Sequence, residues 1–535
     1  MPGDSVTVAE VLRHQARSRE HHPLLVCDGD RISYGEADRR SAELARGLIA
    51  LGAGKGTHVG LLYPNGPEFV VGMLAAARIG AVVIPISTFV TAREMREQLI
   101  DADIQTLLTA ASFCSHDYVR RLADAVSDPG FDTGAPLFAT AVPQLRHVGI
   151  SHQPDAVQRH RDIEGIYRLA DTVETALLQA MQDDVDGCDP LAIVYTSGST
   201  SAPKGVVHTH SALLRHQRNL NAIRGLTAGD RLFCNSPFFW IGGFAFALLA
   251  TLVAGSTLVC SNATDAGRTL DLLESEKPTM TNGFTAGIAH LADHPSFAGR
   301  DLSSLRRGNL YPIMAPEARP ADPELRHNML GMTEAGSIVL IGDDESDQPE
   351  SRRGSFGRPA PGFEARAVDP DTGTPVGVGE SGELCIRGPY LMQRYYKRSR
   401  EESFGPDGWF HTGDLVRTDA DGFFYFVGRL GAMIKTAGAN VSATEVEAAI
   451  ARVTGGLGAY VLGLPDTDRG QLVAAVIVGG DGPAPVDEAA VRERLKSELS
   501  AYKIPRRFVT IARAEVPLLS TGKVDTQRLK RLFDA

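Results

Sequence analysis

The pattern that most constrains the fold lies between residues 42 and 86, where helix-like and strand-like segments alternate. The four segments, in chain order, are 42–48, 58–62, 69–79 and 81–86. The first is amphipathic, the third is rich in alanine, and the other two are short apolar runs. Strand–helix–strand units of this spacing build a parallel, doubly wound sheet. The sequence therefore predicts an α/β fold.

The size of the chain predicts more than one folding unit, because domains usually hold about 100–200 residues and this chain has 535. The net charge of -11 argues against a mainly nucleic-acid-binding protein. The cysteines are isolated from one another, which favours neither a disulfide framework nor a zinc site. The first residues lack the basic end and apolar run of a signal peptide, so we expect a cytoplasmic protein.

One stretch, 232–264, carries no charged residue and is long enough to cross a bilayer. Pro237, Gly242 and Gly255 interrupt it, and no basic cluster flanks it. We therefore expect a buried helix followed by a buried strand, and no transmembrane segment.

Periodicity weakens between residues 112 and 187 and changes again near residue 428. Four histidines are scattered through the first region (116, 147, 152 and 160), and a metal site is one possible interpretation. Because they do not show the spacing of metal ligands, we expect a solvated connecting region instead. Beyond residue 428 a compact pattern follows: helix 443–451, strand 459–464, strand 473–478 and helix 488–499. We predict two domains, 1–428 and 429–535.

The sharpest local motif follows the apolar run 191–195 and reads TSGSTSAPKG over residues 196–205. Hydroxyl side chains, glycines and a lysine directly after a strand suit the binding of polyphosphate. The motif is not the GxxxxGK[ST] loop, because Gly205 follows Lys204. A flexible Ser/Thr-rich turn is the alternative.

This motif resembles the phosphate-binding signature of the adenylate-forming superfamily, which includes acyl- and aryl-CoA synthetases, peptide-synthetase adenylation domains and firefly luciferase. Further blocks of that family follow in the same order, from the Arg31–Tyr34 region to Lys523. The resemblance implies a large N-terminal domain of layered α/β subdomains and a small mobile α+β C-terminal domain. It assigns nucleotide contacts in the loop to Thr196, Ser197, Gly198, Ser199, Thr200 and Lys204.

The other blocks carry further roles by the same resemblance. In Gly331-Met332-Thr333-Glu334, the threonine contacts the α-phosphate and the glutamate binds Mg²⁺, the ligand type that this ion prefers. Asp414, in GWFHTGD, holds both ribose hydroxyls, and Arg429 contacts the same region. Near the end of the chain, Lys523 is the catalytic lysine, acting with Thr333 and Lys204 on the charge of the phosphates. Lys435 contacts the nucleotide, and Gly438 lets the pantetheine arm pass.

Three departures from the family pattern stand out. Where a small Gly-rich adenine loop is expected, residues 310–314 read LYPIM, and Leu330 replaces the usual aromatic residue; Tyr311 is a candidate for the missing stacking. The hinge position is Gly431. In the block that usually faces the acyl carboxylate, Trp240 stands where the family has histidine or another aromatic residue. Trp240 either forms a wall of the acyl pocket or packs in the core. The expected acyl lining is Trp240, Gly242, Asn282, Gly283 and Phe284.

The predicted function is an ATP-dependent acid–CoA ligase with Mg²⁺ as cofactor and coenzyme A as co-substrate. A fatty or bulky alicyclic or aromatic acid would first form an acyl-AMP, and the acyl group would then pass to the thiol. The alternatives are a ligase that loads a carrier protein and a non-catalytic acyl-nucleotide-binding protein, with a luciferase-like oxygenase less favoured. No nucleic-acid partner is expected, and the oligomeric state is open.

Overall fold

The computed structural model describes the chain in ranges separated by short gaps. These ranges are 6–128, 131, 135–151, 161–196, 204–283, 288–430, 433–436, 439–466, 469–479, 486–496, 498–499, 503–519 and 524–534. The chain divides into a first unit (1–198, 202–364 and 387–406) and a second unit (199–201, 365–386 and 407–535). Each unit is described by itself below. The predicted division into 1–428 and 429–535 differs from these units and stays a prediction.

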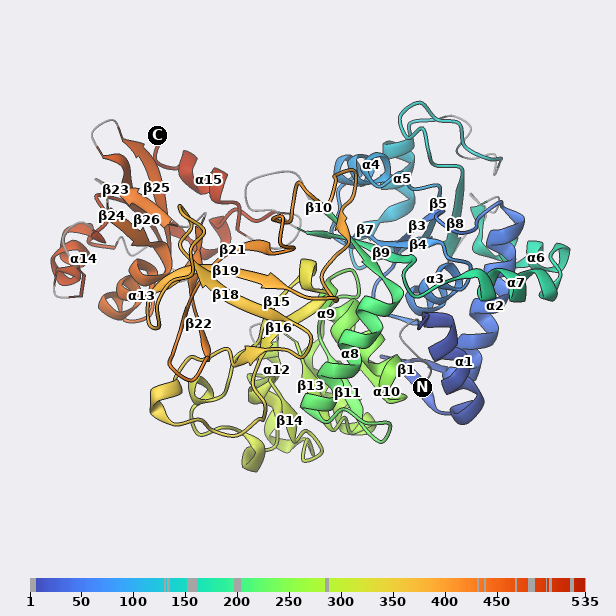
Figure 1. Cartoon of the computed structure of the whole chain (residues 1–535), viewed down its shortest axis with the longest axis horizontal. Coiled ribbons are helices and arrows are strands. Elements are labelled where there is room, and N and C mark those ends of the chain that lie inside the picture. The colour runs from blue at the N-terminus through green and yellow to red at the C-terminus, as the bar shows by residue number, and fades with distance from the viewer. Residues whose placement is uncertain are drawn as a thin grey trace. The chain divides into compact units, whose positions relative to one another are not determined.

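A seven-stranded sheet of the first unit has the order β20-β10-β9-β4-β3-β5-β8 (Figure 1). From β9 to β8 the strands run parallel, whereas β10 and β20 are antiparallel additions at one edge. The bounds are β3 His58–Leu62, β4 Val82–Pro85, β5 Thr106–Ala110, β8 His147–Ser151, β9 Pro190–Thr196, β10 Lys204–Thr209 and β20 Arg394–Tyr395. The predicted parallel α/β sheet is confirmed.

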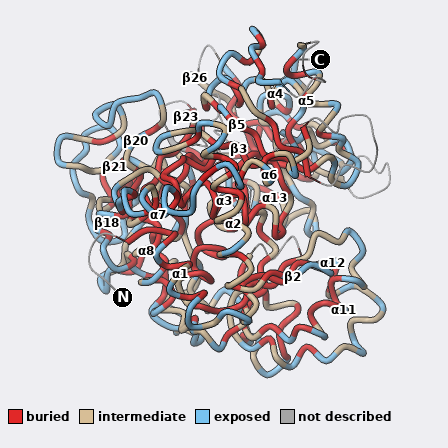
Figure 2. The backbone as a smooth tube through the Cα atoms, turned by 90° about the vertical axis from the view of Figure 1, so that its right-hand side faces the viewer, coloured by how far each residue is buried: buried red, intermediate tan, exposed pale blue. Residues whose placement is uncertain are grey.

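Helix α3 (Pro67–Arg78) lies within the core of this unit, and only Glu68 among its residues is not buried. Proline at its first turn is compatible with the helix, because that position needs no N–H donor. Small residues let it lie close to the sheet: a Cβ on Gly72 would lie 2.9 Å from a methyl carbon of Leu61. Figure 2 shows α3 and the strands β3 and β5 as mostly buried.

The region 112–187 is more ordered than its sequence suggests, and the predicted solvated connection is wrong for much of it. It contains α5 (Tyr118–Val126), α6 (Ile163–Leu169), α7 (Thr175–Asp184) and strand β8, which pairs with β5. The strand is short, and His147 and Gly149 interrupt its apolar pattern. Of the scattered histidines, 116 lies in β7 (His116–Asp117) and 147 in β8, whereas 152 and 160 lie outside the described residues.

A second sheet of the first unit has the order β14-β13-β11-β12-β1-β2 and is parallel except for β2. The bounds are β1 Pro23–Cys27, β2 Asp30–Ser33, β11 Arg231–Cys234, β12 Thr257–Cys260, β13 Met280–Asn282 and β14 Arg307–Gly308. Between β11 and β12 the chain forms α9 (Ile241–Gly243), a π-helix over Phe244–Leu249 and α10 (Ala250–Ala254). The predicted buried helix followed by a buried strand is confirmed.

Within the ranges that the structure describes, none of the helices combines the length and the apolar character that a bilayer crossing requires.

The remaining elements of the first unit complete its layers. Its other helices are α1 (Val8–Arg19), α2 (Tyr34–Ala50), α4 (Ala92–Asp101), α8 (His210–Arg224), α11 (Ala266–Glu276) and α12 (Ala289–Ala292). A small antiparallel sheet holds β15 (Leu330–Met332), β16 (Ser337–Ile341) and β17 (Arg358–Pro359), and β6 (Ser112–Phe113) pairs with β7.

The second unit contains two further sheets. One has the order β18-β19-β21-β22: β18 Glu364–Val368, β19 Ser381–Arg387, β21 Phe410–Thr418 and β22 Phe424–Arg429. The other has the order β24-β23-β26-β25 with β27 beside β26: β23 Met433–Thr436, β24 Ala439–Ser442, β25 Gly458–Asp466, β26 Gly470–Gly479 and β27 Arg507–Ala512. Its helices are α13 (Ala443–Thr454), α14 (Glu488–Leu495) and α15 (Thr526–Arg531).

Candidate functional site

The polyphosphate motif begins in β9 and ends in β10, the two antiparallel strands of a hairpin. Thr196 and Lys204 are register partners across the two strands, and the Thr196 hydroxyl lies 3.5 Å from the Lys204 carbonyl oxygen. The predicted contacts Ser197, Gly198, Ser199 and Thr200 lie outside the described residues. The hairpin therefore fixes both ends of the loop on one sheet.

Tyr395, a residue that the sequence did not indicate, contacts both Lys204 and Glu334. Lys204 Nζ lies 5.0 Å from the centroid of the Tyr395 ring, within cation–π range. The Tyr395 hydroxyl donates a hydrogen bond of 2.8 Å to Glu334 Oε1. Tyr395 reaches this position because β20 pairs with β10, a contact between distant segments that no local pattern reveals.

The backbone of the Gly331–Glu334 motif is held from two sides. Gly331 and Met332 belong to β15, and Thr333 opens a short 3₁₀ turn. His208 Nε2, on β10, donates to the Thr333 carbonyl oxygen at 2.7 Å, and the Met392 amide donates to the Glu334 carbonyl oxygen at 2.8 Å. Thr333 is thus hydrogen-bonded through His208 to the strand that begins with Lys204.

The donor chemistry at Glu334 fits magnesium. Its side chain is half-buried and offers carboxylate oxygens, and Mg²⁺ commonly takes one or two carboxylates together with phosphate oxygens and water. The Tyr395 hydroxyl orients this carboxylate through Oε1. The predicted role of Glu334 is therefore compatible with its surroundings.

In the second unit, Asp414 and Arg429 form an ion pair between β21 and β22. The two residues are register partners, and Arg429 Nε donates to Asp414 Oδ1 at 2.5 Å. The Asp414 side chain is 4% exposed and that of Arg429 56%. Burial raises the pKa of the Asp414 carboxyl above its ordinary value, while the charge of Arg429 opposes that shift. The sequence predicted both residues in the same nucleotide region, and the structure pairs them.

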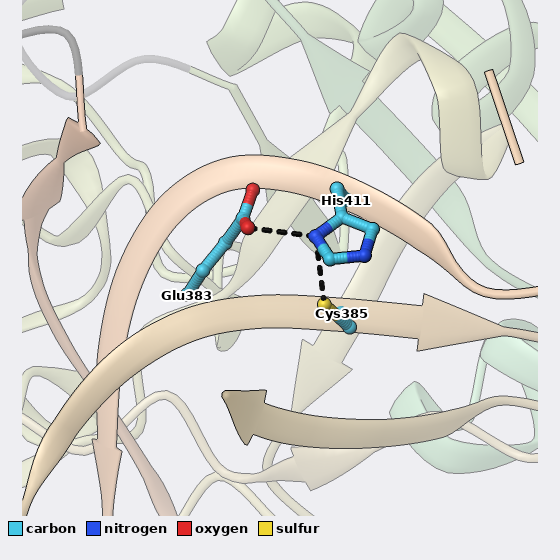
Figure 3. A group of neighbouring side chains, drawn as sticks. All are labelled: Glu383, Cys385 and His411. Carbon is cyan, nitrogen blue, oxygen red and sulfur yellow. Dashed lines mark hydrogen bonds and ion pairs between the residues drawn. The ribbon is translucent and has the colours of Figure 1, made fainter. Parts of the chain in front are cut away.

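Beside this pair, three possible metal ligands lie on one face of the β19–β21 pair. Glu383, Cys385 and His411 bring one ligand atom each within 4.8 Å of one another. Figure 3 shows His411 Nδ1 directed at both neighbours, with Glu383 Oε2 at 2.7 Å and Cys385 Sγ at 3.4 Å. Burial raises the pKa of the Cys385 thiol to about 12, which favours the protonated form. No sequence motif indicated this cluster, because residues 383 and 411 are far apart in the chain.

Some expected acyl-lining residues gather at the carboxyl ends of two parallel strands, where ligands of open α/β sheets commonly bind. Cys234 at the end of β11 is the register partner of Asn282 at the end of β13. Gly283 follows with φ of 151°, and a Cβ there would lie 1.7 Å from Asn235 Oδ1. Asn309, which the sequence did not single out, clamps Gly283 by two hydrogen bonds of 3.1 and 2.8 Å.

Trp240 directly precedes α9 and is half-buried. Its ring packs edge-to-face against Phe239 at 5.6 Å, and Phe239 packs in the same way against Phe89 at 5.9 Å. Phe89 is 44% exposed. Three aromatic rings thus pack in series, with the buried Phe239 between Phe89 and Trp240. The role of Trp240 as a wall of the acyl site stays a prediction.

The expected adenine segment forms a 3₁₀ turn over Tyr311–Ile313. Leu310, Ile313 and Met314 are buried in an apolar cluster, against which the partly buried Tyr311 packs. Leu330 lies in β15 and is half-buried. The stacking role of Tyr311 stays a prediction.

Several predicted residues cannot be placed. Lys523, Gly438 and Phe284 lie outside the described residues, and of Lys435 only the backbone, in β23, is described.

Two protein-family models match this chain. A family model described as "AMP-binding enzyme" matches residues 12–396, and one described as "AMP-binding enzyme C-terminal domain" matches residues 445–523. Both matches follow the chain order in which the sequence motifs were found.

Two relatives match almost the entire chain. A putative acyl-CoA synthetase, YngI of Bacillus subtilis, is 30% identical over 94% of this chain and 92% of its own length. A feruloyl-CoA synthase of an Amycolatopsis species is 30% identical over 97% of each chain. Among solved structures, ATP-bound MatB from Rhodopseudomonas palustris superposes with a TM-score of 0.79 at 25% identity, covering 99% of each chain.

Proposed function

Because the chain belongs to the AMP-binding enzymes and is an AMP-forming acid–thiol ligase, we propose that it joins a fatty or bulky alicyclic or aromatic acid to coenzyme A. The observation that carries this proposal is the Lys204–Tyr395–Glu334 arrangement. It connects the end of the polyphosphate loop to the carboxylate proposed for Mg²⁺.

In the first step, an oxygen of the substrate carboxylate attacks the α-phosphorus of ATP. The bond between the α-phosphorus and the bridging oxygen breaks, and pyrophosphate leaves with the electron pair. Mg²⁺, when bound, neutralises phosphate charge. We assign Lys204 and Thr333 to the phosphates and Lys523 to the charge that develops at the α-phosphate.

In the second step, the sulfur of coenzyme A attacks the acyl carbon of the mixed anhydride. The thiol proton is lost to solvent or a base, a thioester forms, and AMP leaves with the electron pair of the broken C–O bond. We assign Gly438 to the passage of the pantetheine arm, because glycine permits the closest approach to backbone.

We assign the ribose to Asp414. Arg429 contacts Oδ1 of this carboxylate, and Oδ2 is a second acceptor. A carboxylate accepts hydrogen bonds on both oxygens. Arg429, with its exposed side chain, is assigned to the adjacent nucleotide atoms.

The acid class rests on the aromatic series Phe89–Phe239–Trp240. Aromatic rings offer apolar contact area that favours bulky, uncharged acyl groups. The feruloyl-CoA synthase relative, by its name, uses an aromatic acid.

The test measures AMP release from ATP and Mg²⁺ over a panel of long-chain, alicyclic and aromatic acids, each with and without coenzyme A. We expect AMP to form only with both an acid and the thiol. Acid-dependent pyrophosphate exchange without thioester formation would contradict coenzyme A as acceptor, and a carrier protein would then be added in its place. Asp414→Asn is the control: it alters the proposed ribose anchor, and AMP release that depends on nucleotide binding should fall in this variant.

A further inference from the structure

The pairing of β19 with β21, the strand that presents the proposed ribose carboxylate, is irregular between Glu383 and Cys385. Glu383 of β19 pairs with Leu415 of β21, but Cys385, two residues further on, pairs with His411. The segment 412–414 therefore bulges out of the ladder, and Asp414 stands within this bulge. Bulges of this kind re-aim side chains, and they need specific contacts to hold their shape.

Glu383 holds the bulge by both of its carboxylate oxygens. Oε1 accepts a hydrogen bond of 2.9 Å from the backbone N–H of Gly413, and Oε2 accepts one of 2.7 Å from His411 Nδ1 (Figure 3). The side chain is buried. Since Gly413 has a φ of 72°, the conformation that the carboxylate fixes is one that residues other than glycine adopt rarely.

Thr412, inside the bulge, completes the support. Its hydroxyl donates to the Leu384 carbonyl oxygen at 2.8 Å and accepts from the Asp414 N–H at 3.1 Å. Thr412 and Gly413 are thus fixed to consecutive residues of β19, Leu384 and Glu383, and the Asp414 backbone is fixed in turn to Thr412.

We propose that Glu383 is a positioning residue for Asp414, and that His411 orients Glu383 by donating its Nδ1 hydrogen. This inference rests on the proposed role of Asp414 as the ribose anchor. Charge-assisted hydrogen bonds to a buried carboxylate are strong and directional. Glu383 thereby sets the bulge before nucleotide arrives, so that no ordering has to occur on binding.

Cys385 supplies the matched control, because it contacts the same ring nitrogen but not the bulge. Nδ1 carries a single hydrogen, and the shorter contact, to Glu383, takes it. The second ring nitrogen of His411 points away from both groups in Figure 3. The hydrogen bonds of Glu383 to His411 and to Gly413 are called the brace below. A thiophilic cation on the three side chains would require Nδ1 to give up its hydrogen, and it would break the brace.

The experiment measures equilibrium dissociation constants, without turnover, for ATP and for 2′,3′-dideoxy-ATP. We expect Glu383→Gln to weaken ATP binding about tenfold or more, the usual effect of losing a hydrogen bond to a charged group, and to change dideoxy-ATP binding less than about twofold. His411→Ala should act in the same direction. His411→Asn, whose amide N–H can replace Nδ1–H, should restore most of the affinity, and Cys385→Ser should leave both constants unchanged.

Thermal unfolding establishes that each variant is folded, and if Glu383→Gln is not, the His411→Ala and His411→Asn pair carries the test. Equal weakening of both nucleotides by Glu383→Gln, or of neither, overturns the proposal. So does zinc retained at one equivalent by the purified protein and lost in Cys385→Ser. If the unaltered protein and Asp414→Asn bind the two nucleotides alike, the ribose role of Asp414 fails. If Asp414→Asn no longer distinguishes ATP from dideoxy-ATP but Glu383→Gln still does, the ribose role of Asp414 holds and only the positioning role of Glu383 fails.

Discussion

The Tyr395 hydroxyl donates a 2.8 Å hydrogen bond to Glu334 Oε1, while the face of the same ring lies 5.0 Å from Lys204 Nζ. One side chain thus contacts the two groups of opposite charge that are proposed to meet the phosphates. The contact with Glu334 is through the hydroxyl and that with Lys204 is through the π face, so the first can be removed while the second is kept.

Tyr395→Phe should raise the Mg²⁺ concentration required for half-maximal pyrophosphate release. The hydroxyl orients Glu334, and losing a hydrogen bond to a charged group costs about 1.5–3 kcal/mol, or roughly 10–100-fold. Tyr395→Leu removes the ring as well and should also weaken ATP binding. An unchanged Mg²⁺ dependence in Tyr395→Phe would show that the phenol does not act through Glu334.

Lys523→Ala and Gly438→Leu should separate the two half-reactions. Removing the proposed catalytic ammonium should slow pyrophosphate release by about 10²–10³-fold, yet leave the reaction of supplied acyl-AMP with coenzyme A nearly intact. Gly438→Leu should obstruct only the thiol step. Single-turnover assays of each step provide the measurement, and equal losses in both steps for both variants would argue against the assignment.

Gly283→Ala should destabilise the first unit, because its Cβ would lie 1.7 Å from Asn235 Oδ1. Overpacking of this kind usually costs about 1–3 kcal/mol, and the positive φ adds strain. Gly242→Ala is the control, since its Cβ would meet only the Ser236 hydroxyl at 3.4 Å. Urea unfolding of both variants checks this, and equal stabilities would contradict it.

Stability should fall as the pH drops below neutrality. Burial lowers the pKa of His208, His210 and His216 to about 4, from an ordinary value of 6.5. Between these values the unfolded chain binds protons that the folded chain does not. The free energy of unfolding therefore decreases with falling pH. At pH values well below the ordinary pKa, each of these histidines contributes a decrease of about 1.4 kcal/mol per pH unit.

The measurement is urea unfolding at about pH 7 and about pH 5. His210 Nδ1 accepts the Val8 N–H at 3.2 Å, a contact that an asparagine oxygen can replace. His210→Asn should reduce the pH dependence by about one proton. An unaltered slope in this variant would show that His210 already binds its proton in the folded state.

Local patterns predicted those parts of the fold that depend on local sequence. The strands at 58–62 and 82–85 and the helix between them show clear apolar periodicity, and they were predicted correctly. Strand β8 was missed, because its place beside β5 comes from tertiary pairing and its own sequence contains His147 and Gly149. The same distinction holds at the site: Thr333, Glu334 and Asp414 stand in recognisable motifs, whereas Tyr395, Asn309 and Glu383 act through partners distant in the chain.

The π-helix over Phe244–Leu249 lies directly after the segment that begins with Trp240. Such a helix holds an extra residue relative to an α-helix, and it is commonly found at functional sites. The wide turn takes up this extra residue locally, so the segments before and after it keep the directions that an uninterrupted α-helix would give them. In a regular α-helix, one added residue would instead rotate everything that precedes it by about 100°. The wide turn therefore keeps Trp240 in a fixed rotational position relative to α10 although the chain between them is one residue longer.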